Sequence, residues 1–116
     1  MALNSFEGKN IKSVEIGDDQ IKIKCAGEMF ARDYSIFIIQ ISDPNGYFYS
    51  ENNYFTDLGK CTNVYICDEN QYNPIEKIYS NARVLDIECE NDQIEIMIFG
   101  AADDNITVNQ VSKYDY

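Results

Sequence analysis

Carboxylates, thiols and tyrosines are the side chains with which this 116-residue chain could do chemistry, because the sequence contains no histidine. Without histidine, neither a Ser–His nor a Cys–His nucleophile can be assembled. A pair of carboxylates can cleave a glycosidic bond, and Asp86, Glu88 and Glu90 lie close together in the sequence. They alternate with apolar residues, which places them on the water-facing side of a strand, where carboxylates are usually inert. The sequence therefore predicts a protein that is not an enzyme.

The sequence supports metal or cofactor binding as little as it supports catalysis. The turns Asp43–Gly46 and Asp103–Asn105 are rich in oxygen atoms, but neither has the ligand spacing of a calcium loop, and turn chemistry explains both. The four cysteines include no Cys-x-x-Cys pair, so a zinc site is not expected. We predict neither a metal nor a cofactor.

The cysteines are expected to be reduced thiols. Cys25 and Cys89 fall on core-facing positions of predicted strands, where a thiol acts as a small apolar side chain. Cys61 and Cys67 are an even number of residues apart in one predicted strand, which places them on the same face. A Cys61–Cys67 disulfide is the alternative, but cytoplasm keeps thiols reduced.

Tyrosines interleaved with carboxylates are the most suggestive pattern. Five of the nine tyrosines fall within residues 47–72, among several aspartates and glutamates. Tyrosine offers a large, rigid contact area with a polar tip, and a neighbouring carboxylate can pair with Lys or Arg of a partner. The alternative is that these rings cap the core with their hydroxyls in water. The predicted partner-binding residues are Tyr49, Glu51, Asp57, Asp68, Glu69 and Tyr72, with Glu88 and Glu90 as a competing surface.

The net charge of −11, from nine basic and twenty acidic residues, restricts the kinds of partner. Such a field repels nucleic acid and anionic membranes, and it speeds encounter with a basic protein. The alternative is that the acidity only keeps the domain in solution. No apolar run approaches the roughly 20 residues of a membrane span, and the segment Met1–Glu7 does not resemble a secretory signal. We therefore expect a cytoplasmic protein.

Two similar alternating stretches organise the predicted fold. Val14–Gly27 and Val84–Gly100 both contain Asp-Gln-Ile-x-Ile, and alternation of apolar and polar residues predicts a β-hairpin in each. In the second hairpin, the residues predicted to face the core are Leu85, Ile87, Cys89, Ile94, Ile96 and Ile98. Those predicted to face water are Asp86, Glu88, Glu90 and Glu95.

The rest of the chain reads as further strands and turns. Tyr34–Ile41, the most apolar run, predicts a central strand covered on both faces with Ile36 and Ile38 in the core, and residues 36–50 predict a hairpin. The other expected elements are a connection over Gly27–Asp33, a loop or edge strand over Tyr54–Gly59, a strand over Cys61–Cys67, an exposed loop over Asp68–Pro74, a helical turn or short strand over Ile75–Tyr79, a turn over Ala101–Asn105 and a strand over Ile106–Val111. Together they predict one all-β domain over residues 1–116, an antiparallel sandwich or curled sheet of about eight strands.

Three stretches carry a resemblance to a known family: the apolar strand Ile36–Ile41, the Asp-Glu-Asn-Gln-Tyr segment Asp68–Tyr72 and the closing run Val84–Ile98. In this order they resemble small β-rich bacterial immunity proteins, which neutralise polymorphic or contact-dependent growth inhibition toxins. The resemblance implies a cytoplasmic, acidic inhibitor that occludes the basic active site of a toxin, most concretely a nuclease. It assigns no individual binding residue.

Two other classes of function remain open on the sequence. One is a carbohydrate- or ligand-binding β-sandwich that uses tyrosine platforms, although the absence of tryptophan counts against it. The other is an assembly subunit whose acidity has no role in binding a partner. A toxin gene beside this one would favour the inhibitor, and a glycoside hydrolase gene would favour the carbohydrate-binding module.

Overall fold

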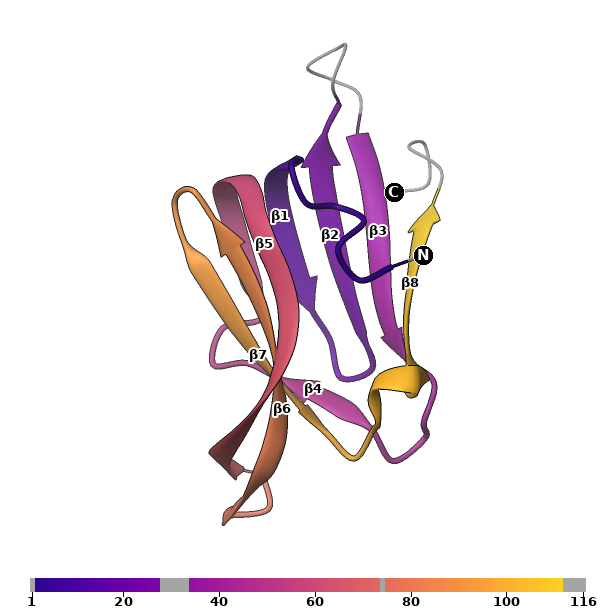
Figure 1. The fold of residues 1–116 in the computed structure, drawn as a ribbon, viewed down its shortest axis with the longest axis vertical. Coiled ribbons are helices and arrows are strands. Elements are labelled where there is room, and N and C mark those ends of the chain that lie inside the picture. The colour runs from indigo at the N-terminus through magenta and orange to yellow at the C-terminus, as the bar shows by residue number, and fades with distance from the viewer. Residues whose placement is uncertain (1, 28–33, 74, 112–116) are drawn as a thin grey trace.

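Eight strands form one antiparallel sheet in the computed structural model, which describes residues 2–27, 34–73 and 75–111. Their order across the sheet is β4-β7-β6-β5-β1-β2-β3-β8, and the sheet curls without closing (Figure 1). The predicted all-β fold of about eight strands is therefore confirmed, in its curled-sheet form. The elements are β1 (Asn10–Ile16), β2 (Gln20–Ala26), β3 (Tyr34–Ile41), β4 (Tyr47–Tyr49), β5 (Tyr54–Asn73), β6 (Ile78–Cys89), β7 (Gln93–Phe99), the short 3-10 helix η1 (Asp103–Asn105) and β8 (Ile106–Val111).

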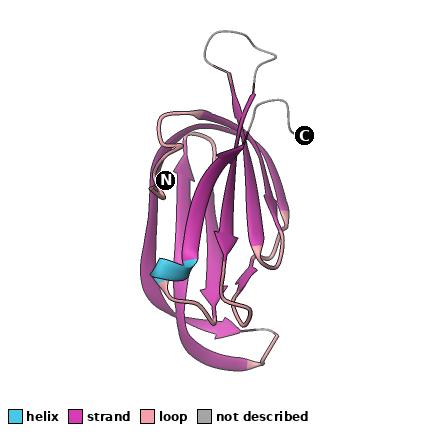
Figure 2. Cartoon of the chain, turned by 90° about the vertical axis from the view of Figure 1, so that its right-hand side faces the viewer, coloured by secondary structure: helices cyan, strands magenta, loops and turns pink. Residues whose placement is uncertain are grey.

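The long strand β5 belongs to both halves of the sheet. Its first part, from Tyr54 to Lys60, pairs with β1, and its second part, from Cys61 to Asn73, pairs with β6. Asp57 and Gly59, just before the change of partner, have positive φ angles of 55° and 80°. Irregularities of this kind bend a strand and increase its twist. Figure 2 shows the resulting curvature, with the far end of the β5–β6 ribbon bending beneath the other strands.

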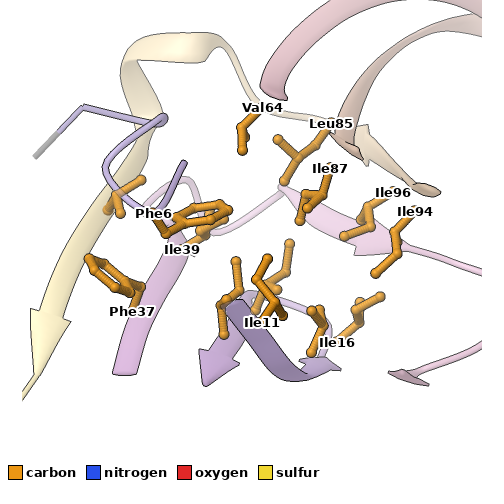
Figure 3. Close-up of a cluster of buried hydrophobic side chains, with 14 of the residues drawn as sticks. Phe6, Ile11, Ile16, Phe37, Ile39, Val64, Leu85, Ile87, Ile94 and Ile96 are labelled. Carbon is orange, nitrogen blue, oxygen red and sulfur yellow. The ribbon is translucent and has the colours of Figure 1, made fainter. Parts of the chain in front are cut away.

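One hydrophobic core lies between the two halves (Figure 3). Strands from both halves contribute to it because alternation turns every second side chain inward. The segment before β1 adds Phe6, whose ring centroid lies 5.8 Å from that of Phe37 on β3. The fully buried core residues include Phe6, Ile11, Val14, Ile21, Ile23, Ile39, Leu85, Ile87, Ile94 and Ile96.

Both predicted hairpins are present. β1 pairs with β2 around residues 17–19, and β6 pairs with β7 around residues 90–92. Most of the predicted core positions are buried, but Ile38 and Cys89 are only half-buried. The bounds of β3 and β8 agree with the prediction, although β3 lies next to the edge strand β8 and exposes Gln40 on one face.

The predicted hairpin over residues 36–50 is wrong. β3 pairs with β2 and β8, whereas β4 pairs with β7 in the other half of the sheet. The turn does form, since the Gly46 N–H donates to the Asp43 carbonyl at 3.0 Å. Beyond it the chain crosses to the other half, where Phe48 is buried in the core. Burial of the Phe48 ring in the core therefore decides where β4 pairs, in place of the local pairing of β4 with β3.

The division of residues 54–74 into three elements is also wrong, because Tyr54–Asn73 is one strand. The predicted loop from Asp68 onward pairs residue by residue with β6, so this polar segment extends a two-stranded ribbon. Residues 75–77 form a turn before β6 begins at Ile78, and the short helix lies at η1 instead. The expected connection over residues 28–33, and Pro74, lie outside the described residues.

Cys61 and Cys67 do not share a face. The register of β5 against β6 shifts between Cys61 and Asn63, which reverses the alternation there. Cys61 is consequently buried in the core, whereas Cys67 lies on the opposite face, with its thiol 3.7 Å from Asp86. A direct Cys61–Cys67 bridge is therefore excluded by the fold.

Candidate partner-binding surface

The candidate site is the face of β4, β5, β6 and β7 that points away from the core. Val64, Leu85 and Ile96 point into the core, so the residues that alternate with them lie on the other side. The strand register aligns these residues in rows across the strands. We call this set the acidic face: Tyr47, Tyr49, Asn63, Tyr65, Cys67, Glu69, Val84, Asp86, Glu88, Gln93, Glu95, Met97 and Phe99.

Asp86 is the centre of the acidic face, and its predicted exposure is wrong: only 3% of it is accessible. The alternation gave the correct face, but Tyr65 on β5 and Glu95 on β7 lie directly opposite Asp86 and cover it. Gln93 Nε2 donates to Asp86 Oδ1 at 2.9 Å, and the Cys67 thiol donates to Oδ2 at 3.7 Å. A buried carboxylate needs such donors, so Asp86 is held in one position.

Glu88 is fixed in a similar way. The Tyr65 hydroxyl donates to Glu88 Oε1 at 2.9 Å, and the Glu88 side chain is half-buried. This hydrogen bond, together with burial and the charges of Asp86 and Glu88, raises the pKa of Tyr65 to about 12. The tyrosine therefore remains a donor at neutral pH and orients the Glu88 carboxylate.

Glu69 and Glu95 are exposed members of the same face. Burial raises the pKa of the Glu95 carboxyl above its ordinary value, and the negative charges of Asp86 and Glu69 add to the shift. Burial and the same two charges raise the pKa of the Cys67 thiol. The charges of Asp86 and Glu69 thus act on both Glu95 and Cys67, and no residue of the acidic face is basic.

Replacing Glu95 by glutamine is expected to stabilise the protein at pH 7 by less than about 1 kcal/mol, because water screens an exposed charge. The pKa of Glu95 is higher in the folded protein than the value of 4.5 expected for the unfolded chain. The parent protein therefore keeps its full stability below pH 4.5 and loses some of it as the pH rises through the pKa of the folded state. The advantage of Glu95→Gln should therefore disappear below about pH 4.5. Urea unfolding as a function of pH measures the difference, and a variant less stable than the parent at pH 7 would contradict the repulsion.

The opposite end of the acidic face is apolar and aromatic. Val84 and Phe99 are buried, and the rings of Tyr47 and Phe99 lie 5.3 Å apart. Tyr49 pairs with Met97, and both side chains are half-buried. Carboxylates and aromatic rings therefore share one continuous surface.

A cleft of about 340 Å³ opens beside this surface. The β4–β7 ladder ends at the Tyr49–Met97 pair, and the chain then diverges from β7 toward β1, where Asn53 O accepts from Ile16 N at 2.8 Å. Phe55, Val84 and Met97 form an apolar part of the cleft wall, and Glu51 and Glu95 form an acidic part. Its lining residues are Ser50, Glu51, Asn52, Phe55, Val84, Gln93, Ile94, Glu95 and Met97.

The structure divides the predicted partner-binding residues among three places. Tyr49, Glu69 and Glu88 lie on the acidic face, and Glu51 lines the cleft beside it. Asp68 and Tyr72 lie on the other face of β5, where Asp68 forms an ion pair with Arg83 at 3.3 Å. Asp57 and Glu90 lie near the bend of β5: the Asp57 carbonyl accepts from Asn91 Nδ2, and Glu90 Oε1 accepts from the Lys60 N–H, each at 3.1 Å.

Ten residues of the acidic face were not among the predicted partner-binding residues, and four of these form its centre: Tyr65, Asp86, Gln93 and Glu95. The signal for Asp86 and Glu95 was the alternation in β6 and β7, which assigns the face correctly. The missing information was the register of β5 against β6, which brings Tyr65 opposite Asp86. Without that pairing, Asp86 has no visible reason to be buried.

No protein-family model, curated protein or solved structure matches this chain. Within the part of the chain that the structure describes, no helix is long and apolar enough to cross a membrane. The described residues also contain no group of three or more Cys, Asp or Glu side chains arranged to hold a metal ion. The acidic face is therefore the feature of the chain that bears on its function.

Proposed function

We propose that the protein is a non-enzymatic inhibitor that binds a basic protein through its acidic face. The observation that carries the proposal is the arrangement around Asp86, where Glu69, Glu88 and Glu95 gather on one face with tyrosines beside them. Like charges held together disfavour the unbound state, and a cationic partner relieves their repulsion. The net charge of −11 adds long-range attraction to the same kind of partner.

The partner is a toxin domain with a basic active site, most concretely a nuclease, and the protein acts as its immunity protein. Carboxylates of the acidic face take the positions of substrate phosphates, and Tyr47 and Tyr49 pack against the rim of the active site. Support for this comes from the resemblance of three stretches to immunity proteins and from the acidic face. Binding by occlusion needs no catalytic group on the inhibitor.

The cleft beside β7 provides a place for one anchoring side chain of the partner. Phe55 and Met97 offer apolar contact for the stem of a lysine or arginine, while Glu51 and Glu95 offer carboxylates to its charged end. Arginine is the favoured anchor, because it forms two parallel hydrogen bonds with a carboxylate and is enriched at interface hot spots.

The test uses tagged protein as bait in a lysate of the source cells, followed by co-expression with the captured partner. Glu69→Lys combined with Glu95→Lys should weaken binding at least tenfold, about 1.4 kcal/mol, and abolish protection from the toxin. Binding should also slow as salt is raised, because added ions screen the field.

The matched control reverses two exposed charges outside the acidic face, Glu15→Lys with Asp104→Lys. The net charge changes by the same amount, so this variant should retain affinity within about twofold at moderate salt. Equal losses in the two variants would show that only net charge matters and that the acidic face has been misplaced. If the bait captures no basic protein, the proposal that this protein is an inhibitor is itself contradicted.

A further inference from the structure

Cys61 on β5 and Cys89 on β6 are directly opposite each other at the bend of the sheet. Cys61 uses its backbone groups elsewhere: its N–H donates to Lys9 O and its carbonyl accepts from Gly8 N, each at 2.8 Å. The adjacent pair carries the strand-to-strand bond instead, from the Glu90 N–H to Lys60 O at 3.0 Å. Cys61 and Cys89 are therefore a non-hydrogen-bonded pair.

This type of pair brings side chains closest together. The Cα atoms of a non-hydrogen-bonded antiparallel pair lie about 4.5 Å apart, within the range of about 4.4–6.8 Å found for disulfides. The two thiols are near enough to affect each other's ionisation: interaction with the Cys61 thiol lowers the pKa of Cys89, partly offsetting the increase caused by burial. Both cysteines are free thiols in the structure.

We propose that Cys61 and Cys89 form a reversible disulfide when the protein meets a small-molecule disulfide such as oxidised glutathione. This inference is independent of the proposed inhibitor function. It assigns a redox-sensitive cross-link to the point where β5 passes from one half of the sheet to the other.

The reaction proceeds by two exchanges. The Cys89 thiol loses its proton, and the thiolate attacks one sulfur of the oxidised glutathione, forming a mixed disulfide and releasing one reduced glutathione. The Cys61 thiolate then attacks the Cys89 sulfur and displaces the second glutathione. The two protein thiols are oxidised by two electrons, the glutathione disulfide is reduced by two electrons, and the protons pass to the glutathione thiolates.

Access favours Cys89 as the first thiol to react, since it is half-buried and ends β6, whereas Cys61 is only 1% exposed. An open hollow lined by Gly8, Cys61 and Glu90 leads toward the pair. Burial raises the pKa of Cys61 to about 12, so little thiolate is present at neutral pH. The cross-link should consequently form slowly at pH 7, with a rate that rises about tenfold per pH unit up to pH 9.

The other two cysteines are badly placed for this bond. Cys67 lies on the acidic face, on the opposite side of β5 from Cys61. Cys25 is on β2, which β1 separates from β5 in the sheet, so Cys25 is the cross-strand partner of neither Cys61 nor Cys89, although burial, and with it the charge of Cys89, raises the pKa of Cys25. The folded protein should therefore form one specific cross-link.

The experiment uses the full chain with Cys67→Ser, because tryptic cleavage leaves Cys61 and Cys67 in the same peptide, residues 61–77. After native incubation with oxidised glutathione at pH 8, mass spectrometry should find residues 61–77 joined to residues 84–113, with Cys25 still open to alkylation. Dithiothreitol should reverse the link. Adding Cys61→Ser should leave glutathione attached to Cys89 and no cross-link, provided that circular dichroism shows the variant folded.

The same incubation in guanidinium serves as the control for specificity, because an unfolded chain joins its cysteines without preference. Cross-linking of Cys25 in the native protein, a persistent glutathione adduct when both Cys61 and Cys89 are present, or three unmodified thiols after prolonged incubation at pH 9 would each overturn the proposal. A rate that does not change between pH 7 and pH 9 would overturn the thiolate mechanism.

Discussion

Replacing Gly100 by alanine is expected to destabilise the protein by roughly 2–5 kcal/mol, although the change adds only one methyl group. Gly100 follows β7 with a φ angle of 71°, which strains any L side chain. An added Cβ would also overlap the Asn45 carbonyl oxygen and lie 3.1 Å from its carbon. Asn45 cannot easily withdraw, since its own N–H is held by Asp43 Oδ1 at 2.9 Å.

Gly8→Ala is the matched control for this prediction. Gly8 also has a positive φ angle, 83°, but no atom lies within 4 Å of an added Cβ. Its cost should be limited to backbone strain, about 1 kcal/mol. Urea unfolding of the two variants measures the difference. Equal costs would mean that the turn around Asn45 moves aside, and that it does not fix the crossing from β3 to β4.

Truncation of Ile96 to alanine is expected to cost roughly 2–5 kcal/mol. Ile96 on β7 is fully buried opposite Leu85 on β6, in the middle of the core. Removing its outer carbons loses their burial and leaves a cavity that the two halves of the sheet cannot close without breaking strand pairing. Thermal or urea unfolding measures the loss.

Ile78→Ala makes the same chemical change at a position that is 50% exposed. It should cost less than about 1 kcal/mol, because surface truncation leaves no cavity. Similar losses at residues 78 and 96 would show that the ribbon end of β6 is as tightly packed as the core. The ratio of the two effects therefore tests the assignment of the inner face of β7.

The local part of this fold could be predicted from the sequence, since alternation depends only on neighbours in the chain. The two hairpins, the bounds of β3 and β8, and the inward positions of Leu85 and Ile94 follow from it. The crossing to β4 could not be predicted, because Phe48 finds its place only in the core that the other half provides. A turn sequence fixes a reversal but not the strand with which the next segment pairs.

The site was less predictable than the fold. Alternation assigned Glu88 and Glu95 to one outer face, but it gave no reason to bring Tyr65 or Glu69 beside them. The polar composition of residues 68–73 favoured a loop, whereas pairing with β6 extends the strand to Asn73. The bulge near Cys61 shifts the alternation by one residue, and that shift decides which cysteines can meet.

The pairing of β3 with β8 has a consequence for how the protein is made. β3 contains the most apolar run of the chain, and its outer edge is covered only when Ile36 pairs with Val111 and Ile41 with Ile106. During synthesis the ribosome releases β3 long before β8, so a nascent chain displays an uncovered apolar edge for the time needed to add about 70 residues. Such an edge can template pairing with other nascent chains. Pairing with β8, which is made last, therefore protects the most apolar strand of the sheet from association with other chains.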